Sequence, residues 1–84
     1  MAPTIMKRET VFNGKTYIQF HGNPFDRGMA DSYYDRPKIP HFYPQGSYHG
    51  EIVKEEAMTQ EEREAYNAGY DYNQELGFKK YSDN

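Results

Sequence analysis

The chain has 84 residues, a formal net charge of -3 and an apolar fraction of 36 %. This length accommodates one small domain, and so low an apolar fraction predicts a thin core. The sequence contains no cysteine, which excludes disulfide bridges and thiolate zinc sites. No apolar run approaches the ~20 residues that a membrane-spanning helix needs. We expect a single cytoplasmic domain over residues 1–84, with flexible ends at 1–6 and 81–84.

The aromatic content and the charge distribution indicate what kind of surface the protein has. The chain has nine Tyr and five Phe, and tyrosine suits half-wet cores and binding surfaces because its ring carries a polar tip. Residues 1–20 have a net charge of +2, whereas residues 51–84 hold nine acidic against four basic groups, a net charge of -5. The acidic second half predicts a solvated helix face and argues against a surface that follows a nucleic-acid backbone.

The first predicted element is a β-hairpin over residues 9–20. Asn13-Gly14 stands between two β-prone runs and favours a two-residue turn, because both central positions need positive φ. This turn pairs Phe12 with Lys15. A lone hairpin is unstable in water, so we expect it to pack on helices. The register divides the apolar residues between two faces, Val11, Ile18 and Phe20 on one and Phe12 and Tyr17 on the other.

A first helix is predicted over residues 24–35. Asn23 is a suitable N-cap, Pro24 fits the first helical position, and Pro37 disfavours helix at the residue before it. The apolar stripe of this helix consists of Phe25, Met29 and Tyr33.

Residues 36–50 are predicted to form a stiff loop, since they include three prolines and two glycines. The loop also carries aromatic rings, which either cover a small core or form a binding surface, and both roles are compatible. Directly after it, residues 51–53 are predicted to add a short third strand to the hairpin.

A second helix is predicted over residues 60–76. Thr59 and Glu62 form a capping-box pattern at its start, and Gly77 is placed to end it. Its apolar stripe consists of Ala65, Gly69, Tyr72 and Leu76, with Tyr66, Tyr70 and Asn73 beside it.

The two helices share a repeat. Phe25-Asp26-Arg27-Gly28-Met29 and Tyr66-Asn67-Ala68-Gly69-Tyr70 both read as an aromatic residue, Asp or Asn, any residue, Gly and a large apolar residue. Glycine costs roughly 1 kcal/mol of helix propensity, so its presence indicates a packing or contact reason. We predict that the helices cross where Gly28 and Gly69 face each other, with Phe25, Tyr66 and Tyr70 packed around the crossing.

Signals of catalysis are weak. The three histidines, at 21, 41 and 49, stand in no metal-binding spacing, the serines lack a nucleophile-elbow context, and no glycine-rich run forms a phosphate loop. We predict that the protein is not an enzyme and that it uses no metal and no cofactor.

The segment from Gly28 to Tyr43 resembles ribosome modulation factor. The shared features are a helix with a glycine near its start, Arg36 eight residues after Gly28, the element Pro40-His41-Phe42-Tyr43, and a second helix with a Gly-aromatic step, here Gly69-Tyr70. The resemblance implies a helical bacterial protein that binds ribosomal RNA and protein and promotes inactive ribosome dimers. The compact, Tyr-rich design is also similar to small phage proteins that bind and block host machines.

Together these observations predict an α+β fold, in which an N-terminal hairpin packs on two helices, and a protein that binds a larger macromolecule to regulate or inhibit it. The partner is either the ribosome or a host protein such as a defence nuclease or a polymerase, while a membrane or a small-molecule substrate is not expected. Arginine pairs with phosphate or carboxylate, and rings supply desolvated contact area. The predicted partner-binding residues are Arg27, Arg36, Phe42, Tyr43 and Tyr48.

Overall fold

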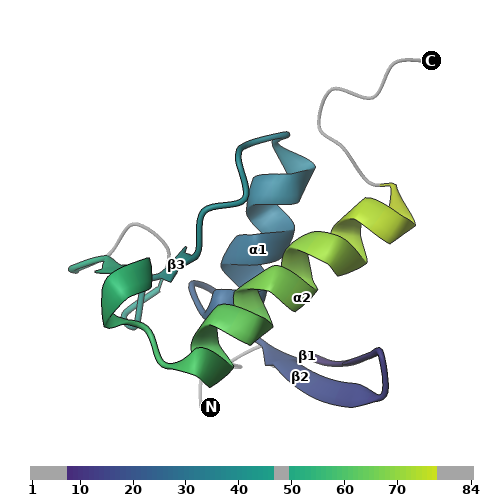
Figure 1. Ribbon diagram of the computed structural model, residues 1–84, viewed down its shortest axis with the longest axis horizontal. Helices are drawn as coiled ribbons and strands as arrows, with labels where there is room; N and C mark the ends of the chain where they lie inside the picture. Colours follow the sequence, from purple (N-terminus) through teal and green to yellow (C-terminus); the bar gives the residue numbers. More distant parts are fainter. Residues whose placement is uncertain (1–7, 47–49, 78–84) are drawn as a thin grey trace, which may run out of the picture.

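A computed structural model describes residues 8–46 and 50–77 and shows an α+β fold (Figure 1). Its elements follow in the order β1 (Arg8–Phe12), β2 (Lys15–Gln19), α1 (Pro24–Tyr33), β3 (His41–Phe42), β4 (Val53–Lys54), the 3-10 turn η1 (Glu55–Ala57) and α2 (Gln60–Leu76). Tyr48 and the predicted flexible ends, 1–6 and 81–84, lie outside the described residues.

The N-terminal hairpin has the predicted turn and register. Asn13 and Gly14 have φ angles of 52° and 77°, and Phe12 pairs with Lys15. The face that carries Phe12 and Tyr17 packs on the helices. The opposite face is solvent-exposed, with Val11 67 % accessible. One face of the hairpin therefore contributes to the core, and the other remains an exposed apolar surface.

Helix α1 begins as predicted and ends two residues earlier than predicted. Asn23 Oδ1 accepts a hydrogen bond from the Asp26 amide at 2.8 Å, which caps the first turn. At the other end Asp35 adopts a left-handed conformation with a φ of 60°. The Arg36 amide then donates to the Asp31 carbonyl at 2.7 Å. This is the Schellman pattern, which ends the helix at Tyr33 before Pro37 can act.

Helix α2 has the predicted bounds because the predicted capping interactions form at both of its ends. Thr59 Oγ1 accepts from the Glu62 amide at 3.1 Å, and Glu62 Oε1 accepts from the Thr59 amide at 2.8 Å. Gly77 ends the helix in a left-handed conformation with a φ of 75°, and its amide donates to the Asn73 carbonyl.

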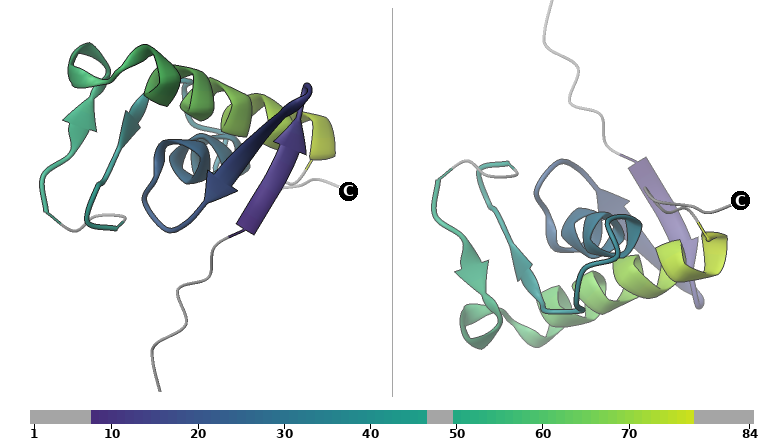
Figure 2. Two further views of the ribbon diagram at one scale, coloured as in Figure 1. Left: turned by 90° about the horizontal axis from the view of Figure 1, so that it is seen from below. Right: turned by 90° about the horizontal axis from the view of Figure 1, so that it is seen from above.

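Residues 51–53 were predicted to add a third strand to the hairpin, and this pairing was wrong. The strand lies at Val53–Lys54 and pairs with β3, so that His41 faces Lys54 across a second antiparallel pair. Figure 2 shows this pair and the hairpin on opposite sides of α1, with α2 running across all three. The loop that contains β3 therefore folds back along the helices and holds β4 away from the hairpin.

The two helices cross in contact through their glycines. A Cβ added to Gly28 would lie 2.0 Å from the Tyr66 carbonyl oxygen, and one added to Gly69 would lie 2.1 Å from that of Phe25. Real Cβ atoms essentially never approach backbone so closely, so the crossing requires glycine at both positions. This is the arrangement that the repeat predicts.

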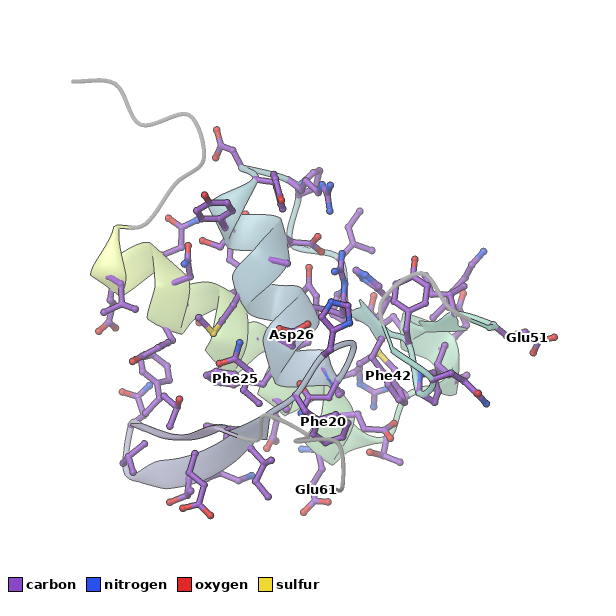
Figure 3. The ribbon with its side chains drawn as sticks, turned by 180° about the vertical axis from the view of Figure 1, so that it is seen from behind. Phe20, Phe25, Asp26, Phe42, Glu51 and Glu61 are labelled. Carbon is purple, nitrogen blue, oxygen red and sulfur yellow. The ribbon has the colours of Figure 1, made fainter. Side chains whose placement is uncertain are left out.

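The core lies on the hairpin side of this crossing. Phe25 is almost fully buried and stacks on the Tyr17 ring at a centroid distance of 5.1 Å. Phe12 and Tyr72 complete the ring cluster with an edge contact at 5.7 Å. Figure 3 shows Phe25 on the hairpin side of α1. The apolar core is thus small and largely aromatic.

Candidate functional site

A buried polar cluster occupies the other side of the crossing. Its centre is Asp31 on α1, whose Oδ2 accepts a hydrogen bond from the hydroxyl of Tyr66 on α2. Tyr66 is fully buried and Asp31 is 4 % exposed. The Ile39 amide donates to the Tyr66 oxygen at 3.2 Å. One phenol therefore joins α2 to α1 and to the chain that leads into β3.

The surroundings of Tyr66 keep its hydroxyl protonated. Burial raises the pKa of Tyr66 far above its usual value near 10, and the hydrogen bond to the Asp31 carboxylate raises it further. A protonated phenol can donate to the carboxylate, whereas a phenolate would place two negative charges side by side. The phenol of Tyr66 therefore remains a hydrogen-bond donor across the physiological pH range.

Two arginines share the Asp31 carboxylate. Arg27 Nη2 lies 3.7 Å and Arg36 Nη1 3.4 Å from Oδ1, so both pairs are longer than an ordinary charge-assisted hydrogen bond. The Arg27 side chain is 5 % exposed, while that of Arg36 is 43 % exposed. Because two guanidinium charges meet one carboxylate, this cluster has a net positive charge.

His41 completes the cluster and is held at both ring nitrogens. Arg27 Nε, which always carries its proton, donates to His41 Nε2 at 3.3 Å. The ring proton is therefore assigned to Nδ1, which lies 3.0 Å from the Ile39 carbonyl oxygen. Both nitrogens of His41 therefore have hydrogen-bond partners within the fold.

An open pocket of about 470 Å³ lies over this cluster. Its lining combines cations, one carboxylate, apolar side chains and rings, contributed by Arg27, Asp31, Arg36, Pro37, Ile39, His41 and Tyr43. The Tyr43 ring lies 5.6 Å from the Arg27 guanidinium, and the Tyr34 ring lies 4.7 Å from that of Arg36. Aromatic faces at these distances attract and orient the guanidinium groups.

A second hollow, of about 310 Å³, differs in chemistry. Its lining includes no basic side chain and consists of Gln19, Asp26, Met29, Ala30, Tyr33, Tyr34 and Asn73. The combination of paired arginines, rings and an apolar wall belongs to the first pocket, which is therefore our candidate site.

The structure brings three of the predicted binding residues together and separates one. Arg27, Arg36 and Tyr43 line the pocket. Arg27, predicted as a partner-binding residue, is buried, because Asp31 and His41 hold it inside the cluster. Phe42 is half-buried on β3 and does not line the pocket, and Figure 3 shows it on the strand-pair side of α1.

The rings predicted to pack around the helix crossing, those of Phe25, Tyr66 and Tyr70, lie there in the structure. Tyr70 also has a second role. Tyr70 packs beside Tyr66 at a centroid distance of 6.4 Å, and its hydroxyl donates to the Arg36 carbonyl at 2.6 Å. Tyr70 therefore helps to hold Arg36 at the pocket rim. Tyr66 likewise supports the pocket through Asp31.

Sequence reasoning missed Asp31 and Ile39. Asp31 stands four residues after Arg27, a spacing that places opposite charges side by side on a helix and could have identified the pair. Ile39 gave no such signal, because its main-chain contacts depend on the position of the folded loop.

Comparisons with protein-family models, with curated proteins and with solved structures found no match. Within residues 8–46 and 50–77, no group of three or more His, Cys, Asp or Glu side chains could hold a metal ion. In the same part of the chain, no helix is long and apolar enough to cross a membrane.

Proposed function

We propose that this protein is a non-enzymatic binding protein that regulates or inhibits a larger macromolecular machine. The observation that carries the proposal is the pocket of about 470 Å³, whose lining includes Arg36, Tyr43 and the buried Arg27. Arginine and tyrosine are enriched among the residues that contribute most to protein interfaces. The pocket face is therefore the proposed contact surface.

A binding role is supported by the hydrogen bonds of the two groups that could act in catalysis, the His41 imidazole and the Tyr66 hydroxyl. Both nitrogens of His41 have hydrogen-bond partners in the fold, and the Tyr66 hydroxyl is committed to Asp31. A general base needs a nitrogen or oxygen within reach of a substrate proton. In this cluster those atoms stabilise the structure, which favours recognition over catalysis.

The first candidate partner is the ribosome, in a bacterial cytoplasm, as the resemblance to ribosome modulation factor implies. The cationic cluster suits ribosomal RNA or protein, because guanidinium groups pair with phosphate and with carboxylate. In this form of the proposal, the bound protein reduces ribosome activity.

The second candidate is a phage-type inhibitor that binds a host protein such as a defence nuclease or a polymerase. It is favoured by exposed carboxylates on η1 and on the first turns of α2, at Glu55, Glu56, Glu61 and Glu64. An acidic surface of this kind complements a basic, nucleic-acid-binding face on a partner and steers its approach.

Affinity capture distinguishes these candidates. The tagged full-length chain is incubated with bacterial lysate, and captured proteins are identified by mass spectrometry at low and moderate salt. Capture of ribosomal proteins together with ribosomal RNA supports the first candidate, and capture of a single non-ribosomal complex supports the second. Recovery of no specific partner would contradict the proposed binding function.

A further inference from the structure

The pocket has two chemically different sides. The cationic side consists of Arg27 and Arg36 around Asp31, and its net charge is positive because two guanidinium groups face one carboxylate. The apolar side consists of Pro37 and Ile39, and Ile39 is 59 % exposed. An occupant that satisfies both sides carries an anionic group next to an apolar group.

The size of the pocket is consistent with such an occupant. A volume of about 470 Å³ falls within the range of roughly 300–1,000 Å³ that is typical of small-ligand sites. A single anion would leave the wall of Pro37 and Ile39 uncovered. A short peptide segment can cover this wall and place a carboxylate at the arginines.

Exposed acidic groups at the β3–β4 end of the molecule disfavour a nucleic acid as the occupant. The strand β4 pairs with β3 beside the pocket and leads directly into η1, which carries Glu55 and Glu56. Figure 2 shows η1 and the start of α2 at the β3–β4 end of the molecule. A nucleic-acid strand presents a phosphate at every nucleotide, so it would bring several negative charges to this acidic end. A single carboxylate brings only one negative charge, and the positive charge of the arginine cluster is enough to attract it.

We infer that the pocket binds a carboxylate group of a partner protein, presented next to an apolar side chain. Arg36 supplies charge-assisted hydrogen bonds at the half-exposed rim, while Pro37 and Ile39 cover the apolar side chain. The carboxylate belongs either to a chain terminus or to an Asp or Glu side chain. This inference rests on the proposed binding function and names the chemistry that the contact surface recognises.

Short peptides test the inference through the backbone amide resonances of the non-proline residues within 36–43. The first probe is acetyl-Ala-Ala-Ala-Ala-Leu with a free terminal carboxylate, and the second is the same peptide with an amidated terminus. A third, amidated peptide carries Glu next to the final Leu, and a single-stranded oligouridine serves as the nucleic-acid probe. The full chain is titrated with each at constant ionic strength.

We expect saturable shifts at Arg36, Ile39 and His41 with a carboxylate peptide, and binding at least about tenfold weaker with the fully amidated peptide. The first and third peptides distinguish a terminal carboxylate from an acidic side chain. Arg36→Gln should weaken binding by about tenfold as well. Lys38→Gln removes the same charge from a neighbouring residue outside the pocket lining and should leave binding unchanged.

The inference would be overturned if the fully amidated peptide without Glu bound as tightly as the better of the two carboxylate peptides. Saturation of the same resonances by oligouridine alone, or no response to any probe, would also overturn it. A partner captured from lysate equally well by the wild type and Arg36→Gln would also overturn it. That last result would leave the proposed binding function intact, so the failures of the two proposals can be told apart.

Discussion

The Tyr66 hydroxyl donates a hydrogen bond to Asp31 Oδ2 at 2.5 Å and so connects α2 to α1 through a buried pair. The same oxygen accepts from the Ile39 amide at 3.2 Å, which attaches the chain leading to β3. One side chain therefore links the pairing of the helices to the position of the chain that lines the pocket. Changes to this pair should affect both stability and binding.

Tyr66→Phe should lower the free energy of unfolding by about 1–3 kcal/mol. The substitution leaves the ring in place, but the buried Asp31 carboxylate loses a donor and the Ile39 amide loses an acceptor. Urea unfolding followed by circular dichroism measures the change. Tyr70→Phe is the matched control, because its hydroxyl bonds to an exposed carbonyl. Equal stability of Tyr66→Phe and wild type would contradict the importance of the pair.

Stability should also fall at high pH because of Tyr66. Its pKa is raised in the folded state, so its stabilising effect is complete below the unfolded value near 10 and decreases as pH rises above it. Between pH 9 and 11 the wild type should lose about 1.4 kcal/mol more than Tyr66→Phe. Unfolding experiments at both pH values test this, and identical pH dependence in the two proteins would be the contrary result.

Gly69→Ala should destabilise the fold even though alanine favours helix by about 1 kcal/mol. The added methyl would lie 2.1 Å from the Phe25 carbonyl oxygen, so the helices must separate. Such overpacking costs typically about 1–3 kcal/mol and occasionally more. Gln74→Ala, at an exposed position of the same helix, should change stability by no more than about 0.5 kcal/mol. A Gly69→Ala variant as stable as Gln74→Ala would show that the crossing tolerates a side chain.

The two faces of the hairpin should respond differently to truncation. Phe12→Ala removes a core ring that contacts Tyr72 and should cost about 3–5 kcal/mol. Val11→Ala, on the exposed face, should change stability by no more than about 0.5 kcal/mol. Thermal and urea unfolding compare the two variants. Similar losses in both would mean that the face carrying Val11 is covered in solution.

Elements with local signals could be predicted from the sequence. The Asn13-Gly14 turn fixed the hairpin register because left-handed angles at two successive residues leave few alternatives. The capping box at Thr59 and the left-handed Gly77 defined α2 to the residue. The glycine repeat located the helix crossing, since glycine inside a helix is costly without a close neighbour.

Elements that depend on distant contacts could not be predicted in this way. A strand pair two residues long, such as His41–Phe42 with Val53–Lys54, has almost no signal of its own and forms because the loop packs along the helices. The end of α1 was missed because Asp35 takes the left-handed position where glycine is usual. The cluster at Asp31 depends on Tyr66, which is 35 positions away in the sequence.

Binding through the pocket face is tested most directly by the dissociation constant of the captured partner for the double variant Arg36→Ala, Tyr43→Ala. Its matched control, Val11→Ala with Lys15→Ala, removes a cation and an apolar side chain from the exposed hairpin. Circular dichroism and urea unfolding establish that both variants fold. We predict at least about a tenfold loss of affinity for the pocket variant and no change for the control. Wild-type affinity in the folded pocket variant would contradict binding through this face.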